Sequence, residues 1–71
     1  MNYEHVANVL CALPSGTEIT VTTFRDTHNG MARDYPGAGR RYTMNFTEWF
    51  ITPKALENLG VTSVKVHGFD L

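Results

Sequence analysis

The chain has 71 residues, of which 42% are hydrophobic, and six Lys and Arg against seven Asp and Glu give it a formal net charge of −1. This length supplies one small core and no second, so we expect a single domain over residues 1–71. The near-neutral charge excludes a chain-wide basic field that would concentrate nucleic acid, and it equally excludes an acidic mimic of DNA.

Residues 3–13 are predicted to form an amphipathic helix. Asn2 is a suitable N-cap, and Pro14-Ser15-Gly16 ends the helix because proline lacks a donor and glycine accepts a left-handed cap. The apolar residues of this segment recur at helical spacing: Val6, Val9, Leu10 and Leu13.

The composition changes at Thr17, where a run rich in β-branched residues predicts a strand over 17–24. Ile19, Val21 and Thr23 share one face of that strand, so one side can face a core and the other solvent.

Residues 26–39 are predicted to form a long loop, because they hold three of the six glycines, one of the three prolines and the turn dipeptide Asn29-Gly30. A loop of this length is uncommon in so small a domain and usually indicates function or disorder. It is therefore the first place to look for a binding surface.

The second half of the chain predicts a strand, a helix and a strand. Residues 40–51 alternate as a second strand, antiparallel to the first, and Phe46 with Trp49-Phe50 forms an aromatic cluster that favours core over interface. Thr52-Pro53 begins a short helix over 54–59 that Gly60 ends, and Val61, Val64 and Val66 indicate a last strand. The expected fold is α+β, in the order helix, strand, long loop, strand, helix, strand, with an antiparallel sheet packed against the helices.

No residue pattern predicts catalysis, a cofactor or a metal site, and we expect the protein not to be an enzyme. His5, His28 and His67 are widely spaced, and a nucleophilic Cys11 would need exposure and an adjacent base. The seven acidic residues are scattered, so no acid/base pair stands out.

The predicted partner-binding residues are Arg33, Tyr35, Arg40, Arg41 and Tyr42, which form a basic and aromatic cluster. Arginine beside aromatics can clamp phosphates and stack on bases, and the same residue types are enriched at hot spots of protein interfaces. The stretch 37–41 is also glycine-rich, but it lacks the Gly-Lys-Ser/Thr ending of a phosphate-binding loop and precedes a strand instead of a helix.

One segment resembles a known family. Arg40-Arg41-Tyr42 running into Phe50-Ile51-Thr52-Pro53-Lys54-Ala55 resembles the wing and following helix of winged-helix DNA-binding proteins over residues 40–60. The resemblance implies that Arg40 and Arg41 touch phosphate at the wing. Ala55 stands where that family commonly has glycine, and residues 19–24 read as a strand where a helix-turn-helix is required.

We therefore expect a small non-catalytic binding protein that occupies a protein or ribonucleoprotein partner. Its size and style resemble the accessory and inhibitor proteins of phages and other mobile elements, including anti-CRISPR-type proteins. The alternative is a winged-helix-like DNA-binding transcriptional regulator, which would act as a homodimer because one small module binds duplex weakly. With no apolar run of about 18 residues and no positively charged leader, a cytoplasmic protein without a membrane partner is the default expectation.

Overall fold

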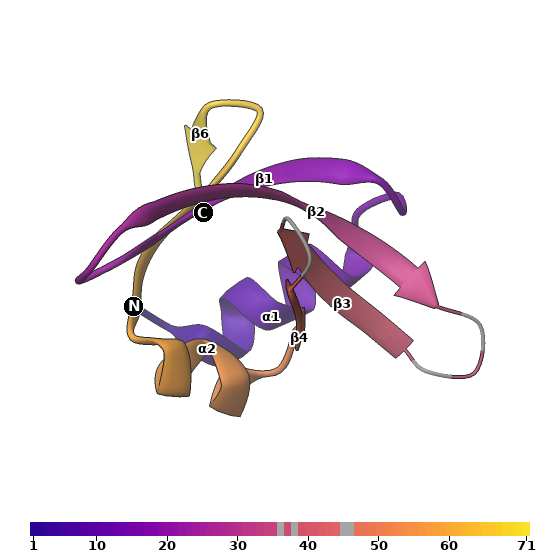
Figure 1. The fold of residues 1–71 in the computed structure, drawn as a ribbon, viewed down its shortest axis with the longest axis horizontal. Helices are drawn as coiled ribbons and strands as arrows, with labels where there is room; N and C mark the ends of the chain where they lie inside the picture. The colour runs from indigo at the N-terminus through magenta and orange to yellow at the C-terminus, as the bar shows by residue number, and fades with distance from the viewer. Residues whose placement is uncertain (36, 38, 45–46) are drawn as a thin grey trace.

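The fold is one antiparallel sheet with two helices on the same side of it. The computed structural model describes residues 1–35, 37, 39–44 and 47–71. In chain order the elements are α1 (Tyr3–Ala12), β1 (Thr17–Thr23), β2 (Thr27–Tyr35), β3 (Gly39–Met44), β4 (Thr47–Phe50), α2 (Pro53–Leu59), β5 (Val61–Val66) and β6 (Phe69–Asp70). The six strands lie in the order β4-β3-β2-β1-β5-β6, and both helices lie beneath the arch of β1 and β2 (Figure 1). The predicted α+β class is confirmed.

Both helices begin where the sequence predicts. The Asn2 side chain accepts a hydrogen bond from the His5 backbone N–H at 3.0 Å, and the Thr52 hydroxyl accepts one from the Ala55 N–H at 3.1 Å. Gly60 ends α2 in the left-handed conformation, with φ of 71°. Capping of this kind fixes where short helices start and stop.

The core lies between the helices and the face of the sheet that they cover. Along β1, Ile19 and Val21 are buried on that face, as their alternation predicts. The buried residues are Val6, Ala7, Leu10, Ile19, Val21, Ala32, Tyr42, Ile51, Leu56, Val61, Val64 and Val66. Val9 and Leu13, expected on the apolar side of the first helix, are only partly buried.

The expected long loop over 26–39 is wrong, because residues 27–35 form strand β2, hydrogen-bonded to β1 on one side and to β3 on the other. Gly30 makes no turn there. A Cβ on Gly30 would lie 2.6 Å from Cε2 of Tyr42 and 2.5 Å from the backbone oxygen of Thr43. Glycine therefore serves close packing inside the sheet, one of the uses of glycine in a strand. Pro36 and Ala38 of that stretch lie outside the described residues.

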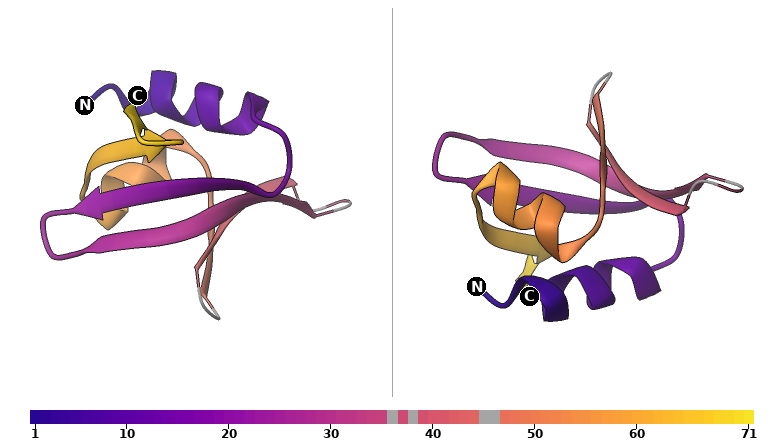
Figure 2. Two further views of the ribbon diagram at one scale, coloured as in Figure 1. Left: turned by 90° about the horizontal axis from the view of Figure 1, so that it is seen from above. Right: turned by 90° about the horizontal axis from the view of Figure 1, so that it is seen from below.

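The single strand expected over 40–51 is two strands, β3 and β4, which pair antiparallel. Seen from above and below, this β3–β4 hairpin turns away from the β1–β2 hairpin as the sheet twists (Figure 2). Trp49 packs against the core as expected, whereas Phe50 is 54% exposed, and Phe46 lies outside the described residues. The predicted last strand over 61–66 is confirmed, and a further short strand, β6, follows it.

Candidate functional site

Strand alternation divides the five predicted binding residues between the two faces of the sheet. In the register of β2 and β3, Arg33 lies directly opposite Arg41, and Tyr35 shares their face. This is the outer face, which we define as the side turned away from α1 and α2. Arg40 and Tyr42 point to the opposite side, where the core lies. The described residues of this stretch form strands β2 and β3, so the predicted cluster is divided between the two faces of the sheet.

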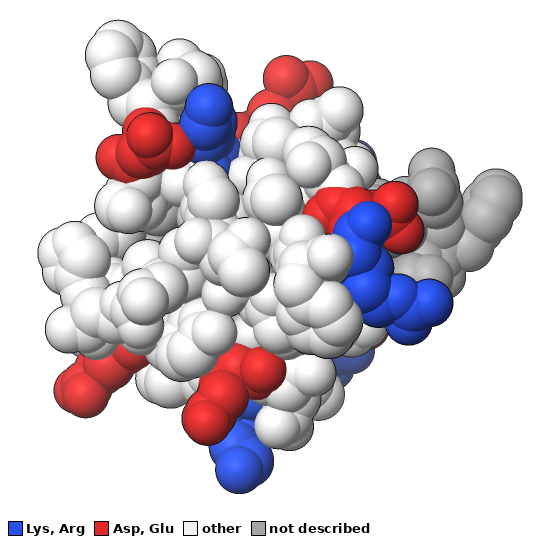
Figure 3. Space-filling model, turned by 90° about the vertical axis from the view of Figure 1, so that its left-hand side faces the viewer, with Lys and Arg blue, Asp and Glu red and all other residues white. Residues whose placement is uncertain are grey.

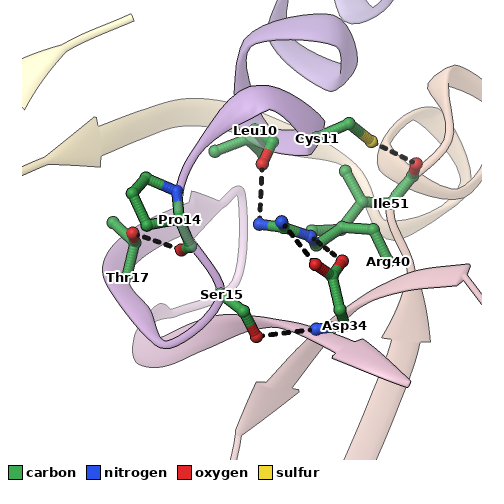
Figure 4. A network of polar contacts seen from close by, with 8 residues as sticks. All are labelled: Leu10, Cys11, Pro14, Ser15, Thr17, Asp34, Arg40 and Ile51. Atoms are coloured by element: carbon green, nitrogen blue, oxygen red, sulfur yellow. Dashed lines mark hydrogen bonds and ion pairs between the residues drawn. The ribbon is translucent and has the colours of Figure 1, made fainter. Parts of the chain in front are cut away.

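Arg40 connects the sheet to the end of the first helix. Its Nε lies 2.7 Å from one oxygen of Asp34 and its Nη2 lies 3.1 Å from the other. Its Nη1 also donates to the backbone carbonyl of Leu10 at 3.3 Å, in the last turn of α1 (Figure 4). With only 9% of the side chain exposed, Arg40 is committed to contacts within the chain. Its geometry is that of a structural residue.

Tyr42 is part of the core. It is 4% exposed, and its ring stacks on Trp49 with centroids 5.6 Å apart and an interplanar angle of 13°. Burial raises the pKa of the Tyr42 phenol to about 12, because water no longer stabilises the phenolate. Its hydroxyl has no hydrogen-bond partner among the described residues. Tyr42 therefore offers no surface to a partner.

Four residues of the outer face, on β2, β3 and β4, are connected by side-chain contacts. The Tyr35 hydroxyl donates to Oε1 of Glu48 at 2.6 Å, and Nη1 of Arg41 lies 3.6 Å from Oε2 of the same carboxylate. The Arg41 guanidinium also lies over the Phe50 ring, 4.3 Å from its centroid, and 5.7 Å from the Tyr35 centroid. We call Arg33, Tyr35, Arg41, Glu48 and Phe50 together the arginine–aromatic surface.

Arg33 is the most exposed cation of this surface. Its Nη2 lies 3.3 Å from the sulfur of Met31, a weak acceptor. The ion pairs found among the described residues join Arg40 to Asp34, Arg41 to Glu48 and Lys65 to Asp70, so none involves Arg33. Its guanidinium therefore faces solvent without a carboxylate beside it.

Two members of the arginine–aromatic surface, Glu48 and Phe50, were not predicted from the sequence as site residues. Alternation along 47–50 already places them on one side and Trp49 on the other, so a signal existed. The sequence does not reveal the strand register, which places Phe50 opposite Arg41 and Glu48 opposite Thr43.

The outer face continues from this surface into a hollow of about 460 Å³ between the β1–β2 ladder and the β5–β6 turn. Glu18, Asn29, Met31 and His67 are among its lining residues. The side of the molecule that lies on the left of Figure 1 carries lysines and arginines next to aspartates or glutamates, with a wide uncharged area between them (Figure 3). This side offers no continuous basic track for a polyanion.

The described residues contain no group of three or more His, Cys, Asp or Glu that could hold a metal ion. Cys11 is exposed, and its Sγ lies 3.6 Å from the carbonyl oxygen of Ile51. Among the described residues, neither helix is long and apolar enough to cross a membrane.

No protein-family model, curated protein or solved structure matches this chain.

Proposed function

We propose that the chain is a non-catalytic binding protein that occupies a protein partner through the arginine–aromatic surface. One observation carries the proposal: Phe50, an apolar ring that is 54% exposed, lies against a guanidinium that is fixed between two aromatic rings and a carboxylate. Residues that dominate the binding energy of protein interfaces are enriched in arginine, tyrosine and tryptophan, and phenylalanine is enriched at interfaces in general. Holding them in place before binding lowers the entropy cost of association.

A protein partner fits this surface better than DNA does. Glu48 lies inside the surface and Glu18 lies on the same face, so a phosphate backbone would meet carboxylates as well as arginines. Duplex affinity depends on neutralising many phosphates, which needs several unpaired cations. The winged-helix alternative also needs two helices that follow each other in the chain, whereas four strands lie between α1 and α2 in the order of the described elements.

Occupation of a groove on the partner is the mode of action that we propose. A few anchors bind, and the rest of the small body excludes competing ligands, as an inhibitor of the kind expected from the sequence would do. Arg33, Tyr35 and Arg41 are the predicted residues that serve as anchors, with Phe50 added by the structure.

The test is selection of peptide ligands from a random displayed library on the immobilised protein. Affinities of the selected peptides are then measured for wild type, Arg33→Ala and Phe50→Ala, with Lys54→Ala on the exposed part of α2 as the matched control. We expect each surface variant to bind at least tenfold more weakly and the control to bind as wild type does. Equal affinity in all four proteins would refute the assignment of this surface.

Two further measurements separate the alternatives. A gel shift of mixed-sequence duplex at about 50 mM salt that weakens steeply as salt rises would favour the DNA-binding alternative. Sedimentation across a range of protein concentrations reports whether a second copy of the chain occupies the surface, because self-association raises the average mass with concentration.

A further inference from the structure

Arg33 and Arg41 are directly opposite each other on neighbouring strands, on a face that neither α1 nor α2 covers. Like charges in that arrangement destabilise a sheet. A neutral or acidic residue at one of the two positions would make the sheet more stable. The pair is therefore a feature that the fold itself does not explain.

The second arginine of the pair is held in place by neighbours. Arg41 has 26% of its side chain exposed, lies over the Phe50 ring and makes a long contact, 3.6 Å, to Glu48. The other oxygen of Glu48 accepts the Tyr35 hydroxyl at the shorter distance of 2.6 Å. The carboxylate is thus shared, and it compensates only part of the positive charge of the pair.

Two arginines against one glutamate leave one positive charge on this surface. We propose that the partner presents a single aspartate or glutamate carboxylate to Arg33 and Arg41, next to an apolar side chain that packs on Phe50. This inference rests on the proposed function and names the chemistry by which the surface selects its partner. Charge-assisted hydrogen bonds from arginine to carboxylate supply both strength and direction.

A carboxylate fits the surface better than a phosphate group. A phosphate monoester carries a charge of about −1.5 to −2 at neutral pH, which exceeds the one charge left uncompensated. Its second charge would also be repelled by Glu48, which lies 3.6 Å from the Arg41 guanidinium. A carboxylate carries one charge and matches the planar guanidinium geometrically.

The direct test is NMR of the arginine Nε–Hε groups of the full chain during titration with sodium acetate, sodium phosphate or sodium chloride at equal ionic strength. We expect saturable shifts at Arg33 and Arg41 with acetate, and no comparable shift at the exposed turn residue Arg25. Parallel shifts at all three arginines, or equal effects of acetate and chloride, would overturn the inference. Phosphate binding tenfold tighter than acetate would overturn it in favour of a phosphorylated ligand.

The selected peptides give the second test and separate this inference from the proposed function. Replacing the acidic residue of a peptide by its amide should weaken binding to wild type about tenfold and leave binding to Arg33→Gln almost unchanged. Peptides that require Phe50 but contain no acidic residue would overturn the carboxylate inference while supporting the proposed function. Thermal unfolding of Arg33→Gln at the wild-type temperature confirms that the variant is folded.

Discussion

Replacing Arg40 by alanine tests whether this residue holds the fold together instead of binding a partner. The substitution removes two hydrogen bonds to Asp34 and one to the Leu10 carbonyl at the end of α1. The Asp34 side chain is 61% exposed, so solvent screens the ion pair and we count it as about 1 kcal/mol. The bond to the carbonyl adds about 1 kcal/mol. The Arg40 side chain is only 9% exposed, so its aliphatic stem also loses packing contacts. The total loss of unfolding free energy is about 2–3 kcal/mol.

The assay is thermal unfolding followed by circular dichroism. For a domain of this size, 1 kcal/mol shifts the Tm by about 4–8 °C, so Arg40→Ala should unfold about 10–20 °C below wild type. Arg33→Ala is the matched control, since it removes an arginine from the neighbouring strand that has no ion pair among the described residues, and it should change stability by less than about 0.5 kcal/mol. If the two variants had the same Tm, the structural assignment of Arg40 would be refuted.

Three further substitutions probe the packing. Gly30→Ala should cost about 3 kcal/mol in urea unfolding, because the new Cβ meets the Thr43 backbone oxygen at 2.5 Å; a loss below 1 kcal/mol would contradict the register of β2 and β3. Burial raises the pKa of Tyr42 from 10.0 to about 12. The folded protein therefore keeps its full stability below pH 10 and loses stability as the pH rises to 12, where the unfolded chain ionises more readily. Between pH 10 and pH 12, the unfolding free energy of Tyr42→Phe should rise by about 2 kcal/mol relative to that of wild type. A difference in unfolding free energy between Tyr42→Phe and wild type that stays constant with pH would contradict the raised pKa. Thr52→Ala removes the cap bond to the Ala55 N–H and should lower the unfolding free energy by about 1 kcal/mol, whereas no change would show that α2 does not depend on its cap.

The sequence predicted the elements whose signals are local. Asn2 and Thr52 mark helix starts by hydrogen bonds made within a few residues, and the β-branched run at 17–23 has no competing interpretation. Strand β2 was not predicted because Gly30 was interpreted as a turn residue. The glycine is instead required by a contact with a residue that is distant in the sequence. The ring of Tyr42 crosses over it from the neighbouring strand, and no local pattern indicates that contact.

The candidate site was predicted only in part for the same reason. The sequence cluster grouped residues by proximity along the chain, but adjacent residues in a strand point to opposite faces. Arg40 and Tyr42 were therefore assigned to the same surface as Arg41, although they lie on the other side of β3. Prediction of Phe50 and Glu48 required the pairing of β3 with β4, which follows from the folded sheet and not from residue type.

Whether a partner binds at the arginine–aromatic surface is tested by NMR mapping of a selected peptide on the isotopically labelled chain. We expect the largest shift changes on binding to cluster on the outer face, at Arg33, Tyr35, Arg41 and Phe50, with little change in α1 and α2. Changes centred on the two helices, with these four residues unaffected, would contradict it.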